Sequence, residues 1–119
     1  MDYKDILEKH GDDSLVEVLE YSSGRLVLRV LLDAIGGREI RIISNRPYHL
    51  DMPPKLMLGT IQVGDCHILP DGYLNTRNRG YDGDEGSWQV MRITDDEQNE
   101  YYAILSAVDG TLIFLDGNI

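Results

Sequence analysis

Two short clusters contain residues of types that bind metal ions. They are His10 with Asp12 and Asp13, and Asp65 with Cys66 and His67. A zinc site needs three or four converging ligands, and the sequence has no CxxC, HxxxH or HExxH pair to hold two of them on one element. Adjacent strand residues point to opposite faces, so Cys66 and His67 are poorly placed to act as nucleophile and base. We therefore predict no metal site, and we interpret Cys66 as a buried thiol.

The stretch Asn75–Ser87 is polar and rich in glycine, and we expect it to form a surface loop. Asp82, Asp84 and Glu85 lie in it at the spacing of a short calcium loop, but an EF-hand needs more oxygen ligands and two flanking helices. Tyr81 and Trp88 bracket these acids, and aromatic residues beside charged ones are typical of interface anchors. We predict that these five residues bind a partner protein. A solvated acidic loop and a weak calcium site are the alternatives.

Motifs for catalysis and for cofactors are missing from the sequence. It contains neither the Gly-x-Ser-x-Gly of a nucleophile elbow nor the GxxxxGK[ST] of a phosphate-binding loop. The 21 acidic residues always include some pair at the spacing of a glycosidase, so such pairs do not discriminate. We predict that the protein is not an enzyme, that it has no catalytic residues and that it uses no cofactor.

The net charge of −10 is distributed unevenly along the chain. Residues 1–20 sum to −5 and residues 81–100 to −6, whereas residues 21–80 sum to +3 and the remainder to −2. Like charge repels nucleic acid and anionic membranes and attracts basic surfaces. The distribution predicts a basic protein partner, and it argues against nucleic acid and membrane as partners.

A chain of 119 residues is long enough for one core, and we expect a single domain over residues 1–119, as a monomer or homodimer. No apolar run is long enough to cross a bilayer, and the first residues do not resemble a signal peptide. The single cysteine fits a reducing compartment. These features predict a cytoplasmic protein.

Short apolar runs separated by turn residues predict strands. We expect one short helix near the N-terminus, capped by Asp2 and docked through Ile6 and Leu7, followed by strands with tight turns. The expected strands cover residues 15–21, 25–33, 38–44, 56–63, 87–94, 100–108 and 111–116. The first three strands should form one meander and the last three another, the final hairpin turning at Asp109 and Gly110.

Two stretches within this pattern have special features. Asn45–Lys55 contains three prolines, which cannot donate to a ladder, and we expect an extended loop there. Gly59 should weaken or bulge the strand over residues 56–63.

Charged residues alternate with apolar ones in the second and third expected strands. The solvent-exposed face of these strands should therefore carry Arg25, Arg29, Glu39 and Arg41, and the aliphatic residues between them should lie in the core. The arginines, together with Arg38, could form a basic stripe. We favour the alternative that Glu17, Glu20 and Glu39 pair with them across strands.

The absence of long helical periods between strands argues against a parallel sheet. The fold class we predict is mostly β (α+β): an antiparallel meander sheet, a small sandwich or a partly open barrel, with one short N-terminal helix.

The acidic, aromatic-flanked segment Tyr81–Glu85 and the segment His10–Glu20 with its following hairpin resemble small acidic immunity proteins of bacterial polymorphic-toxin systems. That resemblance implies a non-enzymatic inhibitor that covers the active site or substrate groove of a basic toxin domain, such as a nuclease. A DNA-mimic inhibitor and an uncharacterised bacterial ligand-binding β domain are the alternatives. An immunity protein should show a patch of acids and aromatics, a DNA mimic a linear array of carboxylates, and a ligand binder a deep apolar pocket.

Overall fold

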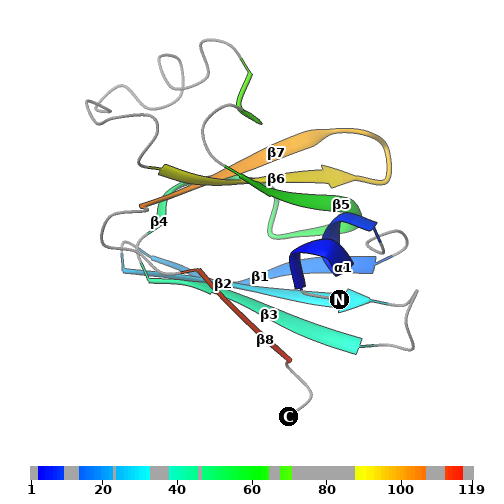
Figure 1. Cartoon of the computed structure of the whole chain (residues 1–119), viewed down its shortest axis with the longest axis horizontal. Coiled ribbons are helices and arrows are strands. Elements are labelled where there is room, and N and C mark those ends of the chain that lie inside the picture. The colour runs from blue at the N-terminus through cyan, green and yellow to red at the C-terminus, as the bar shows by residue number, and fades with distance from the viewer. Residues whose placement is uncertain are drawn as a thin grey trace.

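The structure is a computed structural model that describes residues 3–9, 14–22, 24–32, 38–45, 47–64, 68–70, 88–106 and 112–116. Within these ranges it has one helix and one open antiparallel sheet of eight strands (Figure 1). The helix is α1 (Tyr3–Lys9). The strands are β1 (Ser14–Ser22), β2 (Arg25–Leu32), β3 (Arg38–Ser44), β4 (Pro47–Asp51), β5 (Lys55–Gly64), β6 (Trp88–Asp95), β7 (Glu100–Ser106) and β8 (Leu112–Asp116).

The strand order is β4-β7-β6-β5-β1-β2-β3-β8, which joins two meanders through one central pair. The meander β1-β2-β3 is extended by β8, and the meander β5-β6-β7 is extended by β4. The first half of β5 pairs with β1 from Lys55 to Leu58, and the second half pairs with β6 from Leu58 to Gly64. Strand β5 therefore belongs to both halves of the sheet.

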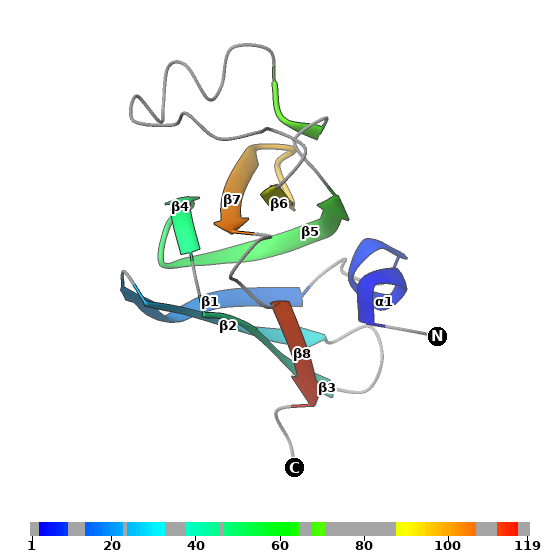
Figure 2. The ribbon, with the colours of Figure 1, turned by 60° about the vertical axis from the view of Figure 1, so that its left-hand side comes forward.

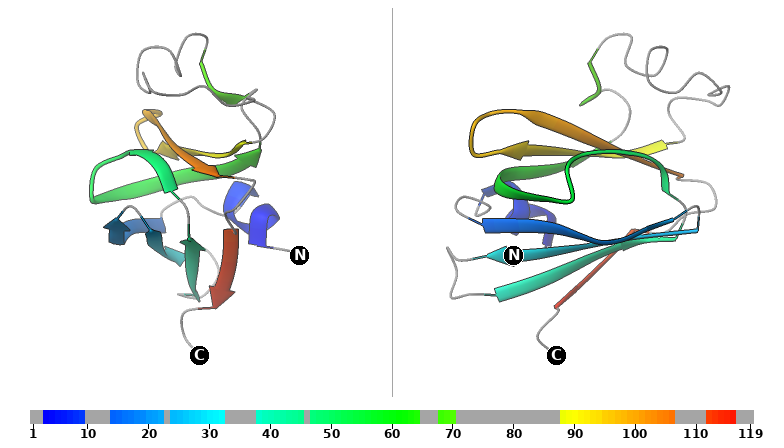
Figure 3. Two further views of the ribbon diagram at one scale, coloured as in Figure 1. Left: turned by 90° about the vertical axis from the view of Figure 1, so that its left-hand side faces the viewer. Right: turned by 180° about the vertical axis from the view of Figure 1, so that it is seen from behind.

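The two halves of the sheet lie face to face, with the main core between them (Figures 2 and 3). Alternate residues of the strands point inward, as the period of two in an extended strand requires. The fully buried aliphatic residues come from both halves, and they include Val16, Leu28, Val30, Ile40, Ile42, Leu58, Ile61, Met91 and Ile93. One strongly coiled sheet thus encloses its own core.

A bulge at Gly59 marks the point where β5 changes partner. The register of β5 against β6 shifts between Leu58 and Thr60. A Cβ on Gly59 would lie 2.9 Å from the backbone oxygen of Asp95 and 3.1 Å from that of Thr94. Only glycine lets the two backbones approach this closely, and bulges bend and twist a strand. The bulge that the sequence predicts at Gly59 is confirmed.

Helix α1 covers the open side of the coiled sheet between β5 and β8 (Figure 2). Ile6 and Leu7 are buried in the main core, as predicted. Thr60 of β5 donates a hydrogen bond of 3.0 Å to the carbonyl of Glu8. On the other side, the ring of Tyr3 stacks on Phe114 of β8 at 6.0 Å between centroids. A seven-residue helix is too short to be stable alone, so these contacts hold it.

The outer face of the β6–β7 half carries a second, smaller cluster. Val90, Tyr102 and Ile104 are buried there, and Ile68 and Leu69 pack against them. Among the described residues, no helix has the length and apolar composition needed to span a membrane.

All seven predicted strands are present, with bounds that agree to within one residue wherever the chain is described. The first meander, β1-β2-β3, has the expected antiparallel pairing. Strand prediction from alternation therefore succeeded.

One strand was missed. The prediction of a connecting loop over Asn45–Lys55 is wrong in part, because β4 occupies Pro47–Asp51 and β5 begins at Lys55. Strand β4 is at the edge of the sheet and Pro47 is its first residue, a position where the missing amide donor costs no ladder hydrogen bond. Pro53 and Pro54 lie in the connection to β5.

The predicted final meander is wrong as well. Strand β8 pairs with β3, from Ile40–Asp116 to Ser44–Leu112, whereas β7 pairs with β4 and β6. The hairpin turn predicted at Asp109 and Gly110 lies outside the described residues, and the strands that precede and follow it, β7 and β8, are not neighbours in the sheet. The turn signal in the sequence is local, whereas the long-range pairing of β8 with β3 decides where the last strand lies and extends the sheet on the β3 side.

We expect Gly59→Ala to reduce the free energy of unfolding by about 1–3 kcal/mol, because the added Cβ meets backbone that cannot rotate away. Gly24→Ala is the control, since nothing lies within 4 Å of its Cβ, and its effect should stay within about 0.5 kcal/mol. Urea unfolding of both variants measures the difference. Equal effects would contradict the role assigned to the bulge.

Candidate functional site

The residues predicted to bind a partner lie mostly outside the described ranges. Tyr81, Asp82, Asp84 and Glu85 are not described. Trp88 begins β6, where its backbone pairs with Ser106, and its side chain is not described. Their role in binding stays a prediction.

The two clusters with metal-binding residue types, at residues 10–13 and 65–67, also fall outside the description. Within the described ranges, no three His, Cys, Asp or Glu side chains converge in a way that would hold a metal ion.

Five of the described acids gather around the turn between β6 and β7. We call this group the acidic turn, and its members are Asp51, Asp95, Asp96, Glu97 and Glu100. Asp96, Glu97 and Glu100 are exposed, while Asp95 is only 8% exposed. Asp51 ends β4, and it joins the group because its backbone pairs with Tyr102 of β7.

Asp95 organises the turn through its carboxylate. One oxygen accepts the backbone N–H of Glu97 at 2.9 Å and that of Asn99 at 2.8 Å, and the other accepts the Asn99 side-chain amide at 3.1 Å. An aspartate that binds the amides that follow it is a common way to fix a turn. Gln98 takes a positive φ of 70° within it. The turn therefore presents Asp96 and Glu97 to solvent in a defined conformation.

The electrostatics of the turn follow from these contacts. Burial raises the pKa of Asp95, but hydrogen bonds from Asn99, from the Glu97 amide and from Tyr101 outweigh burial and hold that pKa below its ordinary value. Burial and the charge of Asp95, with smaller effects from Asp51 and Glu97, raise the pKa of Tyr101. Asp95 thus remains ionised, and Tyr101 remains a neutral donor beside it.

The neighbouring tyrosine is held in the same way. The Tyr102 hydroxyl donates to Glu100 at 2.7 Å, and burial together with this hydrogen bond raises the Tyr102 pKa to about 12. Both tyrosines therefore stay protonated near neutral pH, next to carboxylates that carry charge.

Strand β6 separates Trp88, which begins the strand, from the acidic turn at the end of the strand. The acidic turn instead approaches the N-terminal segment. Ser14 of β1 pairs with Leu58, which also pairs with Asp95, and α1 lies at the same end of the sheet (Figures 1 and 3).

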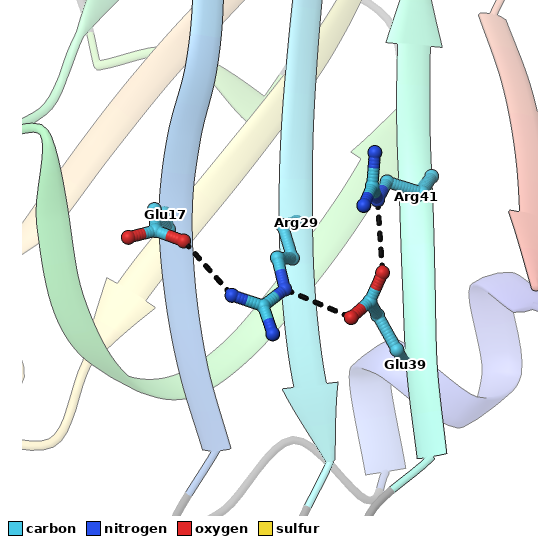
Figure 4. Close-up of polar contacts among 4 residues, drawn as sticks. All are labelled: Glu17, Arg29, Glu39 and Arg41. Atoms are coloured by element: carbon cyan, nitrogen blue, oxygen red, sulfur yellow. Dashed lines mark hydrogen bonds and ion pairs between the residues drawn. The ribbon is translucent and has the colours of Figure 1, made fainter. Parts of the chain in front are cut away.

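A second polar feature crosses the sheet half formed by β1, β2 and β3, on the face turned away from the core. It is a ladder of ion pairs formed by Glu17, Arg29, Glu39 and Arg41 (Figure 4). Arg29 donates to Glu17 at 3.2 Å and to Glu39 at 2.8 Å, and Arg41 donates to the second oxygen of Glu39 at 2.9 Å. The side chain of Glu39 is 8% exposed, so this carboxylate is satisfied by two arginines.

The ladder confirms in part that the arginines pair with carboxylates across strands. Arg29 reaches Glu17 and Glu39 on the two neighbouring strands, whereas Arg41 bonds to Glu39 of its own strand, and Glu20 is not a member of the ladder. Arg38 bonds to Asp116 of β8 at 2.9 Å. This last pair could not be predicted without the β3–β8 register. The basic stripe considered from the sequence is thus largely neutralised by neighbouring carboxylates.

Sequence reasoning did not single out the acidic turn. Its signal is the polar run Asp95–Asn99 between two strands, but the prediction gave the partner-binding role to the acids before Trp88. Comparisons with models of protein families, with curated proteins and with solved structures find no match to this chain.

We expect Glu39→Gln to destabilise the protein near neutral pH. Hydrogen bonds from Arg29 and then Arg41 hold the Glu39 pKa below its ordinary value, despite burial. The stabilisation is therefore present above the ordinary carboxyl pKa, and it is lost as the pH falls through the lower folded-state pKa. The difference in unfolding free energy between wild type and variant should shrink over that acidic range.

Chemical denaturation at a series of pH values tests this expectation. Glu20→Gln is the control, because Glu20 is exposed and pairs opposite Val27 on the same sheet, so its effect should be small at every pH. A difference for Glu39→Gln that stays constant into acid would contradict the assigned ion pairs.

Proposed function

We propose that this protein is a non-enzymatic binding protein that recognises a basic protein partner, in the manner of small immunity proteins that cover a toxin domain. The observation that carries the proposal is the placement of the described acids. Glu17 and Glu39, on the outer face of β1 and β3, bond to arginines, whereas Asp96 and Glu97 project from a turn that Asp95 fixes through its hydrogen bonds. The acidic turn is therefore the densest group of exposed acids among the described residues.

Such an arrangement suits fast recognition of a basic surface. Clustered exposed charge raises the rate of encounter with an oppositely charged partner, and the effect falls as salt screens it. The turn is organised before binding by three hydrogen bonds to Asp95, so little conformational entropy is lost on association. A toxin domain with a cationic substrate groove is a partner of this chemistry.

The DNA-mimic alternative fits the described residues less well. A mimic of the phosphate backbone needs carboxylates in an extended line. Here five of the described carboxylates cluster at one turn, and Glu17 and Glu39 alternate with Arg29 and Arg41.

The first test uses a short oligolysine peptide as a probe of the acidic turn. Asp96→Asn with Glu97→Gln removes two charges from the turn, and Glu20→Lys changes the net charge by the same amount elsewhere. We expect the turn variant to weaken oligolysine binding several-fold more than Glu20→Lys at low salt, as measured by isothermal titration calorimetry. Equal weakening by both variants would mean that only net charge matters.

The second test sequences the genes beside this one and takes as its probe any basic domain that they encode, as purified protein. The turn variant should slow its association and flatten the salt dependence, with little change in dissociation. If the turn variant binds like wild type while amides at Asp82, Asp84 and Glu85 slow association, the site is the loop predicted from sequence. The absence of binding by the wild-type chain would contradict the proposed function.

A further inference from the structure

Strand β8 is one of the two edges of the sheet, and its composition lacks the usual protection. Its sequence is LIFLD, and in the described part of the chain no strand pairs with its far side. Natural proteins protect edge strands with lysine, proline, inward-pointing charge or bulges. Strand β8 has a regular register with β3, no proline, and one charged residue, Asp116, which is bonded to Arg38.

The opposite edge, β4, is protected in the expected ways. It begins with Pro47, its register with β7 shifts between Pro47 and His49, and it ends with Asp51. The contrast indicates that the β8 edge is open for pairing, whereas the β4 edge is not.

The side chains of β8 favour a particular neighbour. Ile113 is 44% exposed and Leu115 is 46% exposed on the outer face, where they lie opposite Ile43 and Arg41 of β3. Phe114 points to the other face and stacks on Tyr3. A neighbouring strand that covers the two exposed residues needs apolar side chains at alternate positions.

We infer that β8 pairs with β8 of a second copy of this chain, in antiparallel orientation about a twofold axis near Phe114. In that register Ile113 of one copy lies opposite Leu115 of the other, so the same two residues cover each other. The two eight-stranded sheets become one continuous sheet. The pairing needs no new partner chemistry, because an isologous interface only has to complement itself.

Charge also favours a second copy at this position. Two chains of net charge −10 repel each other, so they can meet only where the local charge is close to zero. At β8 the carboxylate of Asp116 is compensated by Arg38, which also lies over the Tyr3 ring at 5.4 Å. Strands β5, β1, β2 and β3 separate β8 from the β6–β7 hairpin that carries the acidic turn. Among the described residues, the charged side chains beside β8 are Arg38, Arg41 and Asp116, and each of them is paired with an opposite charge.

Sedimentation equilibrium of the whole chain over a range of concentrations tests the inference. A five-residue edge buries less surface than a standard interface, so we expect a reversible dimer whose fraction rises with concentration. Lysine at an edge strand blocks such pairing. We expect Ile113→Lys and Leu115→Lys each to raise the dimer dissociation constant at least tenfold.

Met57→Lys is the matched control. Met57 is 44% exposed on β5, but β5 is an interior strand with both edges paired, so the dimer should persist in this variant. If Met57→Lys dissociates the dimer as well, the interface is the face of the sheet and the edge pairing is wrong. A wild-type chain that stays monomeric at every concentration would also overturn the inference.

A milder substitution separates loss of the dimer from loss of the fold. Leu115→Thr introduces a β-branched residue suited to a strand and removes most of the apolar contact, and circular dichroism verifies the fold. It should weaken the dimer less than Leu115→Lys and more than Met57→Lys. A folded Leu115→Thr or Leu115→Lys variant that dimerises like wild type contradicts pairing through β8.

Discussion

The pairing of β1 with β5 is the contact on which the rest of the architecture depends. It spans only four residue pairs, from Ser14–Leu58 to Glu17–Lys55, yet among the described strands it is the one pairing that joins the two halves of the sheet. Immediately beyond Leu58 the bulge at Gly59 bends β5 onto β6. Without that bend, the apolar faces of the two halves would point away from a shared core.

The same geometry distributes charge over the surface. On the outer face of β1, β2 and β3, the strand register places Arg29 beside Glu17 and Glu39, so its positive charge compensates these two carboxylates. At the end of β6 the chain must turn, and Asp95 uses its carboxylate to bind the turn amides. The acids beside it are left exposed. An exposed acidic turn and a charge-compensated edge at β8 therefore arise from one topology.

Local patterns predicted the strands well, because the alternation of apolar and charged residues, as in Ile40, Arg41 and Ile42, matches their alternating burial. They could not reveal which strands pair at long range, and for this reason β8 was assigned to β7 instead of β3. Three prolines made the segment that contains β4 look like a loop, but an edge strand tolerates a proline that an interior strand does not. For the site, the alternation of charged residues predicted the cross-strand pairs of Arg29 with Glu17 and Glu39. The acidic turn could not be predicted in this way, because its conformation depends on the hydrogen bonds that the Asp95 carboxylate accepts from the turn.

Native-state hydrogen exchange tests most directly whether β5 binds the two halves into one cooperative unit. The slowest amides of β2 and of β6 should open with the same free energy, and Gly59→Ala should lower that value equally in both strands. The result that would contradict this account is exchange of the β6 and β7 amides through a smaller opening, while β1 and β2 keep their full protection.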